Sequence, residues 1–200
     1  WSGLWWLATQ RVENSFYKWF NQKGSNIEVS YRKMSTAGYP NRVDLSLEGF
    51  SISNSKNKYI VSTELIQFLT LIYNKSHLIS IIKPPIHIKL NNVNFEISAD
   101  PIKSSLKLNK ERNIIDLISD GQNLQIQDFK NNIWGLKRLL LAIGKDNVST
   151  PETYRTHITF QNINIPQDYL DLNSKFSMLS SNVNMISLNS TIRFDENFIN

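Results

Sequence analysis

Cysteine is absent from this chain of 200 residues, which excludes a thiol nucleophile, a cysteine-based zinc site and a disulfide framework. Long apolar runs are missing too. Since no stretch of about 18 apolar residues occurs, the chain as it stands has no segment suited to cross a bilayer as a helix. The balance of isoleucine, aromatic and charged residues is nevertheless that of a folded protein, and the length is sufficient to bury a core.

Clusters of basic charge are also missing, although the net charge is +5 and the pI is about 9.3. The lysines are scattered singly, and the short segment Tyr31-Arg32-Lys33 is the nearest approach to a basic patch. A nucleic-acid reader needs a basic helix, or aromatic residues interleaved with basic ones. We therefore expect a solvated surface and no nucleic-acid partner.

Motifs of common catalytic and cofactor sites do not occur. The chain has no G-x-S-x-G elbow, no glycine-rich dinucleotide loop, no phosphate-binding P-loop and no H-E-x-x-H pair. His77, His87 and His157 are far apart and lack the spacing of metal ligands. We expect no enzyme, no cofactor and no metal site; only a carboxylate pair assembled in three dimensions would allow glycosidase-type chemistry.

Residues 1–20 predict a helix with one apolar stripe. The stripe residues step by four and three along the chain: Trp1, Trp5, Ala8, Val12, Phe16 and Trp19. Trp1, Trp5 and Trp6 crowd the first turn, as in an interfacial aromatic belt, so they are candidate membrane-interface residues. The alternative is that the stripe docks on a sheet as core. Gly24 is expected to end the segment.

After the helix the main pattern is alternation with period two. Val43, Leu45 and Leu47 alternate with polar residues, and Phe50 and Ile52 resume on the opposite parity after Gly49, which predicts a bulge or a bend. The same alternation recurs along the rest of the chain. Further strands are expected around 86–90, 93–97, 102–108, 124–126, 158–160 and 192–194, with a turn at Asn91-Asn92.

Two segments interrupt this alternation. Residues 64–73 fit either a buried strand or a short helix, whereas residues 133–143 predict a helix capped by Gly144. Residues 145–153, with Pro151, are the best candidate for a loop or subdomain boundary.

The predicted fold is mainly β with a few helices: an antiparallel, curved meander or sandwich-like sheet with an N-terminal helix. We expect a juxtamembrane amphipathic helix at 1–24 and a β-rich domain at 25–200. Because the first methionine is Met34 and an alternating segment lies next to the C-terminus, we expect the natural protein to extend beyond both ends.

The segment from Thr36 to Leu47 carries a family resemblance. Its Gly38-Tyr39-Pro40-Asn41-Arg42 turn, followed by alternating leucines, is similar to the GFPFR-x-x-L-x-L signature of alphaproteobacterial domain-of-unknown-function family 2125. Asn41 stands where that signature has Phe. The opening Trp5-Trp6 helix and the segment 73–79 resemble further elements of the family, with Lys75 in place of Pro.

The resemblance implies a membrane-anchored periplasmic protein with no known activity. Its anchor would be an N-terminal segment, not present in this chain, in the inner membrane. No catalytic residue is carried over. The signature residues of the turn are Gly38, Tyr39, Pro40 and Arg42.

Two functional hypotheses follow. The first is a non-enzymatic module whose curved sheet binds lipid or another hydrophobic ligand and which lies against the membrane lipid surface. The second is a structural or interaction subunit that packs against a partner protein of the cell envelope; an uncovered edge strand would favour it. The candidate ligand face consists of Leu45, Leu47, Ile88, Phe95, Leu106 and Ile126.

Overall fold

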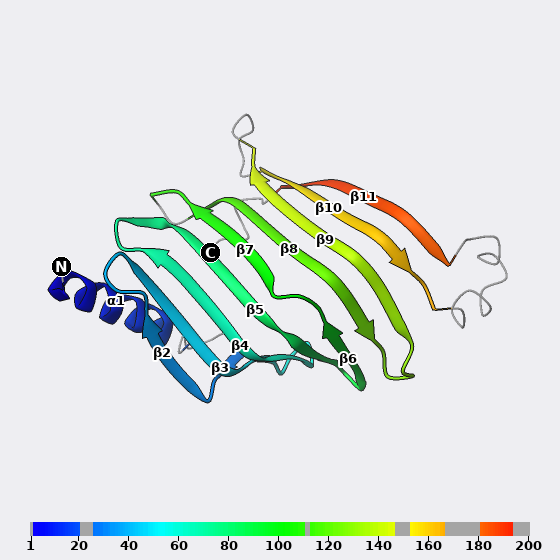
Figure 1. Ribbon diagram of the computed structural model, residues 1–200, viewed down its shortest axis with the longest axis horizontal. Helices are drawn as coiled ribbons and strands as arrows, with labels where there is room; N and C mark the ends of the chain where they lie inside the picture. The colour runs from blue at the N-terminus through cyan, green and yellow to red at the C-terminus, as the bar shows by residue number, and fades with distance from the viewer. Residues whose placement is uncertain (1, 21–25, 111–112, 147–152, 167–180, 194–200) are drawn as a thin grey trace.

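The computed structural model describes residues 2–20, 26–110, 113–146, 153–166 and 181–193. Among them, one helix precedes the strands of a curved antiparallel sheet (Figure 1). The elements are α1 (Ser2–Phe20), β1 (Ile27–Ser30), β2 (Lys33–Ala37), β3 (Arg42–Asn54), β4 (Tyr59–Leu71), β5 (Asn74–Leu90), β6 (Val93–Ser98), β7 (Ile102–Leu108), β8 (Ile114–Gln127), β9 (Ile133–Lys145), β10 (Thr153–Asn164) and β11 (Asn182–Arg193).

The sheet is a meander, with most strands next to their neighbours in sequence. Its order is β1-β3-β4-β5-β6-β8-β9-β10-β11, with β2 also paired to β3. β6 and β7 both lie between β5 and β8: β6 pairs with β5 at 86–90, and β7 pairs with β5 at 77–82. The expected antiparallel, mainly β architecture with an N-terminal helix is confirmed.

The best-packed core lies where α1 meets β3. Leu45 and Leu47 are fully buried there and form a cluster with Phe50 and Ile66. Two residues of the predicted helical stripe, Val12 and Phe16, pack against this cluster. The α1 stripe thus docks on the sheet as core along this part of its length, because a helix with one apolar face must bury it.

Of the bulge or bend expected at Gly49, the bulge is absent, because the β3–β4 register does not shift between Glu48↔Leu65 and Phe50↔Thr63. Gly49 has φ +59, a conformation that favours glycine, and Phe50 joins the same core cluster as Leu47. The turn at Asn91-Asn92 is confirmed, with Asn91 at φ 54. Of the two alternatives for residues 64–73, the strand is correct, since β4 extends to Leu71 and is paired with β3 and β5.

The helix predicted at 133–143 is wrong, because this segment is β9. Leu136, Leu140 and Ile143 do have helical spacing, but the run from 139 to 143 is wholly apolar and fits a strand equally well. β9 pairs along its length with β8 and β10, and those ladders decide the outcome. Gly144 is correspondingly a strand residue and not a helix cap.

Three smaller expectations fall outside the described residues. They are the helix end at Gly24, most of the loop at 145–153 including Pro151, and Phe194 in the last strand. The described part of the last strand, β11, ends at Arg193.

Candidate functional site

The register sorts the side chains of the sheet onto two faces of different character. Directly paired residues on neighbouring strands point to the same side. We call the side that packs against α1 the apolar face, and its rows continue far beyond the helix. The rows include Leu78, Leu106, Leu117 and Ile143; Ile86, Ile97, Ile126 and Trp134; and Ile88 with Phe95.

All six residues of the candidate ligand face lie on the apolar face, but in two settings. Leu45 and Leu47 are 0% exposed beneath α1, so they belong to the core and are not available to a ligand. The others are only partly buried: Ile88, Phe95, Leu106 and Ile126. Of the described helices and strands, none is packed over these four in the way that α1 covers β3.

A polar row interrupts the apolar face in the middle of the sheet. Ser80, Ser104 and Ser119 stand opposite one another on β5, β7 and β8, and the Ser104 hydroxyl donates to the Ser119 Oγ over 2.9 Å. This row separates two apolar bands, one with Leu106 and the other with Ile102. The face therefore offers mainly methyl and aromatic carbon, with a narrow line of hydroxyl groups.

The opposite side, which we call the polar face, carries pairs of opposite charge across neighbouring strands, together with some apolar residues such as Ile79, Ile118 and Leu140. Lys107 lies opposite Asp116, with Nζ 3.4 Å from Oδ2. His87 lies opposite Glu96, with Nδ1 3.5 Å from Oε2. Charges placed opposite one another in this way are typical of a solvated sheet surface.

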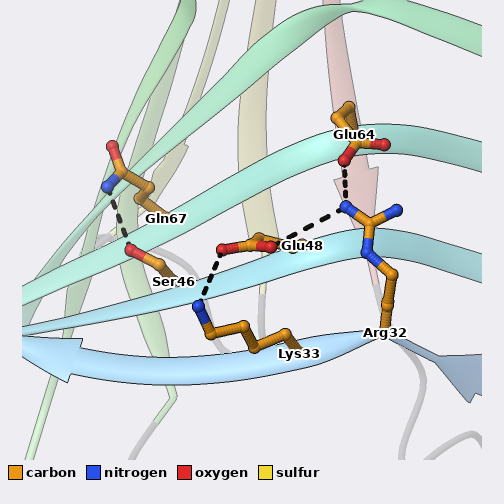
Figure 2. A network of polar contacts seen from close by, with 6 residues as sticks. All are labelled: Arg32, Lys33, Ser46, Glu48, Glu64 and Gln67. Carbon is orange, nitrogen blue, oxygen red and sulfur yellow. Dashed lines mark hydrogen bonds and ion pairs between the residues drawn. The ribbon is translucent and has the colours of Figure 1, made fainter.

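Figure 2 shows the polar face over β2, β3 and β4. Arg32 pairs with Glu64 and lies 3.7 Å from Glu48, which Lys33 approaches to the same distance. The hydrogen bond to Glu64 raises the pKa of Arg32. Because these side chains are largely exposed, the network adds little to stability, but it makes this side of the sheet hydrophilic.

Asp120 and Arg138 form the best-defined ion pair of the polar face. Arg138 donates from Nε and Nη2 to the two carboxylate oxygens, each over 2.9 Å. This hydrogen bonding holds the pKa of Asp120 below its ordinary value and raises that of Arg138. A carboxylate kept ionised in this way is suited to hold β8 against β9, and not to accept a proton in catalysis.

An open pocket of about 540 Å³ lies over β4, β5, β6 and the β8–β9 turn. Its lining includes Ile60, His87, Lys89, Glu96 and Phe129. Ile88 and Phe95 of the candidate ligand face also border it. The pocket combines apolar surface with both signs of charge, and nothing in it favours one ligand chemistry.

The three histidines have separate local partners. His77 Nε2 lies 2.9 Å from Ser105 Oγ, and His157 Nδ1 lies 2.6 Å from Asn189 Oδ1. His87 faces Glu96 as described above. Within the described ranges no three side chains of His, Asp or Glu come together in a way that could hold a metal ion.

The signature turn anchors the first part of α1. Gly38 has φ +97, and a Cβ there would lie 2.7 Å from the Arg42 carbonyl oxygen, so only glycine fits. Pro40 follows a cis peptide bond, and the Arg42 guanidinium pairs with Asp44. The indole of Trp5 donates from Nε1 to the Arg42 carbonyl over 2.8 Å, and its ring meets Tyr39 edge-on at 5.7 Å.

The candidate membrane-interface residues therefore differ in their surroundings. Trp5 points to the signature turn, whereas Trp6 is 59% exposed. Trp1 lies outside the described residues. In the part of the chain that the structure describes, no helix has both the length and the hydropathy to cross a membrane.

β11 lies at one edge of the sheet. It pairs with β10 from Thr153↔Arg193 to Asn164↔Asn182. Among the described residues, no strand pairs with the outer side of residues 183–193. Its 12 residues include one charge, Arg193, and neither Pro nor Gly.

Over the residues that the structure describes, the fold is thus an antiparallel β-sheet with one N-terminal helix and two faces of different composition. The chain belongs to the bacterial family described as "Uncharacterized protein conserved in bacteria (DUF2125)", whose model matches residues 5–196. No curated protein and no solved structure matches it.

Sequence reasoning found the apolar alternation but missed features that depend on long-range pairing. Among these are the bond from Trp5 to Arg42, the Asp120–Arg138 pair and the serine row. Their residues are distant in the chain, and only the strand register brings them together. Of these features, only the serine row had a signal in the sequence, because serine repeatedly replaces an apolar residue at apolar strand positions.

Proposed function

We propose that this protein is a membrane-anchored periplasmic module of the bacterial envelope that binds lipid or another hydrophobic ligand on its apolar face. The observation that carries the proposal is the difference between the two faces of one sheet. Rows of leucine, isoleucine and phenylalanine cross β5 to β9 on one side, whereas the other side of the same strands combines opposed charges with apolar residues such as Ile79 and Ile118.

Partial exposure supports a binding role for this face. Ile88, Phe95, Leu106 and Ile126 retain accessible surface, while Leu45 and Leu47 under α1 retain none. Contiguous exposed apolar surface is unfavourable in water, and in soluble domains it commonly marks a binding site. An acyl chain laid along the strands would cover the two apolar bands, and the serine hydroxyls would meet a polar group of the ligand.

The role proposed is binding without catalysis. The apolar rows contain no titratable side chain, and an apolar ligand held there would contact methyl, aromatic and hydroxyl groups. The tryptophan-rich first helix supports placing the module next to a membrane, and the family match supports a bacterial one.

The test is native mass spectrometry of the gently purified protein, with extraction and identification of bound lipid. We expect stoichiometric lipid on the wild type. Phe95→Asp and Leu106→Asp should each abolish lipid retention, because a carboxylate placed on the apolar face cannot stay ionised against acyl chains without a large desolvation cost.

Matched controls lie next to these residues on the polar face. Asn94→Asp and Ser105→Asp add the same charge one position away, on the opposite side of β6 and β7, and should retain lipid. A wild-type protein free of lipid would refute the proposal. Loss of folding in Phe95→Asp and Leu106→Asp, equal to the loss of lipid, would show that these residues are core.

A second candidate function is favoured by β11. A long edge strand with one charge is an open template for another β-strand, and natural sheets usually protect such edges. A structural or interaction subunit, joined to a partner envelope protein through this edge, is therefore the alternative.

A further inference from the structure

Exposed aromatic side chains gather at one end of the sheet. Trp6 is 59% exposed, Tyr39 58% and Tyr73 74%, and the neighbouring Leu7 is 47% exposed. They come from α1, from the turn between β2 and β3, and from the turn between β4 and β5. Three segments that are far apart in the sequence thus each present a large ring to solvent.

Contacts fix these three segments next to one another. The Trp5 indole joins α1 to the turn at 38–41 through the Arg42 carbonyl and the Tyr39 ring. The Ile72 amide donates to the Asn41 carbonyl over 3.2 Å and joins the turn at 72–73 to the same place. Figure 1 shows the N-terminal end of α1 at the side of the sheet where β4 runs into β5.

We infer that this end of the molecule, formed by Trp6, Leu7, Tyr39 and Tyr73, inserts into the interface of a lipid bilayer. Tryptophan and tyrosine have an apolar ring with one polar group, and they are enriched where hydrocarbon meets lipid headgroups. The inference rests on the membrane attachment included in the proposed function, and it adds which residues touch the lipid and how the sheet is oriented.

Trp5 has a different role from the one its position in the sequence indicates. Its Nε1 is bound to the Arg42 carbonyl, so it positions α1 and the Tyr39 ring, whereas Trp6 faces outward. The signature turn therefore couples the first helix to the lipid-facing end. This gives a physical reason for the presence of Gly38 and Pro40 in the turn: they shape the backbone whose Arg42 carbonyl accepts the hydrogen bond from Trp5.

Charge contributes little to this contact. Trp6, Leu7, Tyr39 and Tyr73 are all uncharged, and three of the cations at this end are paired with carboxylates: Arg42 with Asp44, Lys107 with Asp116 and Arg155 with Asp146. Ring insertion, and not attraction to anionic headgroups, should supply most of the binding. We expect binding to uncharged phosphatidylcholine vesicles as well as to anionic ones, with weak dependence on salt.

The orientation has a consequence for the apolar face. Since β4 and β5 meet at Tyr73, their strands lead away from the bilayer, and the apolar bands begin near the lipid surface. A lipid leaving the bilayer at this end would encounter the row of Leu78, Leu106 and Leu117 directly.

The test is co-sedimentation of the protein with phosphatidylcholine vesicles, with and without one quarter phosphatidylglycerol. The double variant Tyr39→Ser/Tyr73→Ser should bind about tenfold more weakly. Phe129→Ser is the matched control, because Phe129 is also 59% exposed but lies in the turn between β8 and β9, at the other end of the strands. It should bind like the wild type.

A second measurement does not depend on loss of binding. Because the chain has no cysteine, Tyr73→Cys and Phe129→Cys can each carry a single environment-sensitive dye. Vesicles should shift the emission to the blue at position 73 but not at 129. Equal shifts at both positions, or no shift at 73, would overturn the inference. So would a vesicle-independent shift at 73 that grows with protein concentration, which would identify this end as a contact between copies.

Failure of this inference can be separated from failure of the ligand proposal. Native mass spectrometry of Tyr39→Ser/Tyr73→Ser should still show bound lipid, since both residues lie outside the apolar rows. Loss of vesicle binding with lipid retained supports the inference. Vesicle binding that is unchanged in the double variant refutes it, whatever the state of the apolar face.

Discussion

Asp120 and Arg138 link β8 to β9 through two hydrogen bonds of 2.9 Å, and the pKa of Asp120 lies below its ordinary value of 3.8. A carboxyl group with a depressed pKa binds protons less readily in the folded state than in the unfolded one. Its contribution to stability is complete above the unfolded pKa and is lost as the pH falls through the folded pKa. Acid below about pH 4 should therefore weaken this link.

Asp120→Asn tests this linkage. We expect the variant to be less stable than the wild type at pH 7, and the difference between the two to shrink as the pH falls below about 4. Urea unfolding at a series of pH values measures it. Asp116→Asn removes a longer contact, 3.4 Å from Lys107, and should cost less at pH 7. A difference between Asp120→Asn and wild type that does not change with pH would contradict this account.

The signature turn shows what can be predicted for single residues. Gly38 and Pro40 predict a turn from their backbone preferences alone, and the structure contains it. The partner of Trp5 could not be predicted, because it is a backbone carbonyl 37 residues away. Four asparagines have φ between 49 and 65, a conformation that asparagine tolerates well: Asn91, Asn123, Asn131 and Asn162. Because the sequence is rich in asparagine, it does not indicate which of them adopt this conformation.

At the scale of elements, alternation predicts the strands that have one polar face and fails for β9. The segments around Val43 and Ile88 alternate strictly, so their strand state follows from period two. In β9 both faces are filled with apolar residues over 139–143, and the local pattern then fits a helix or a strand. Pairing with β8 and β10 stabilises the strand over the helix, and this pairing cannot be read from the local sequence.

The edge strand β11 yields a prediction at this scale. Leu188 is 53% exposed on β11, and Leu188→Lys places a charge where a neighbouring strand would pair. If β11 joins a partner strand, this variant should associate about tenfold more weakly with that partner or with a second copy. Sedimentation velocity over a range of concentrations measures the association with a second copy.

The control for Leu188→Lys is Ile60→Lys. Ile60 is 42% exposed, but it lies on β4, which is paired on both sides by β3 and β5. It should leave association unchanged. If Leu188→Lys and Ile60→Lys weaken association equally, surface hydrophobicity and not the open edge is responsible, and the interaction function loses its support.

For the whole molecule, composition and alternation correctly indicate an antiparallel meander with an N-terminal helix. The placement of β6 and β7 side by side between β5 and β8 could not be predicted. β5 is 17 residues long and pairs with one short strand along each half. The sequence of an extended segment does not indicate how many strands pair with the same edge of it. The division into two faces followed from alternation, whereas the accessible part of the apolar face depends on where α1 docks.

Among the described residues a helix covers the sheet only at β3, so the sheet should be unevenly stable, and hydrogen exchange measures this directly. Val43, Leu45 and Leu47 are at most 1% exposed, whereas nearly every described residue of β11 is exposed. We expect amides of β3 and β4 to exchange at least about a hundredfold more slowly than those of β11. Uniform exchange along the sheet would contradict this gradient.

Ligand binding should change that gradient in one region. An added short-chain phospholipid that binds the apolar face should slow exchange in β5 to β9, where Leu106 and Ile126 are partly buried, and leave β3 unchanged because α1 already covers it. Slowing confined to β11 would instead indicate strand addition at the open edge. Hydrogen exchange therefore separates the two candidate functions within one experiment, by the strands that become protected.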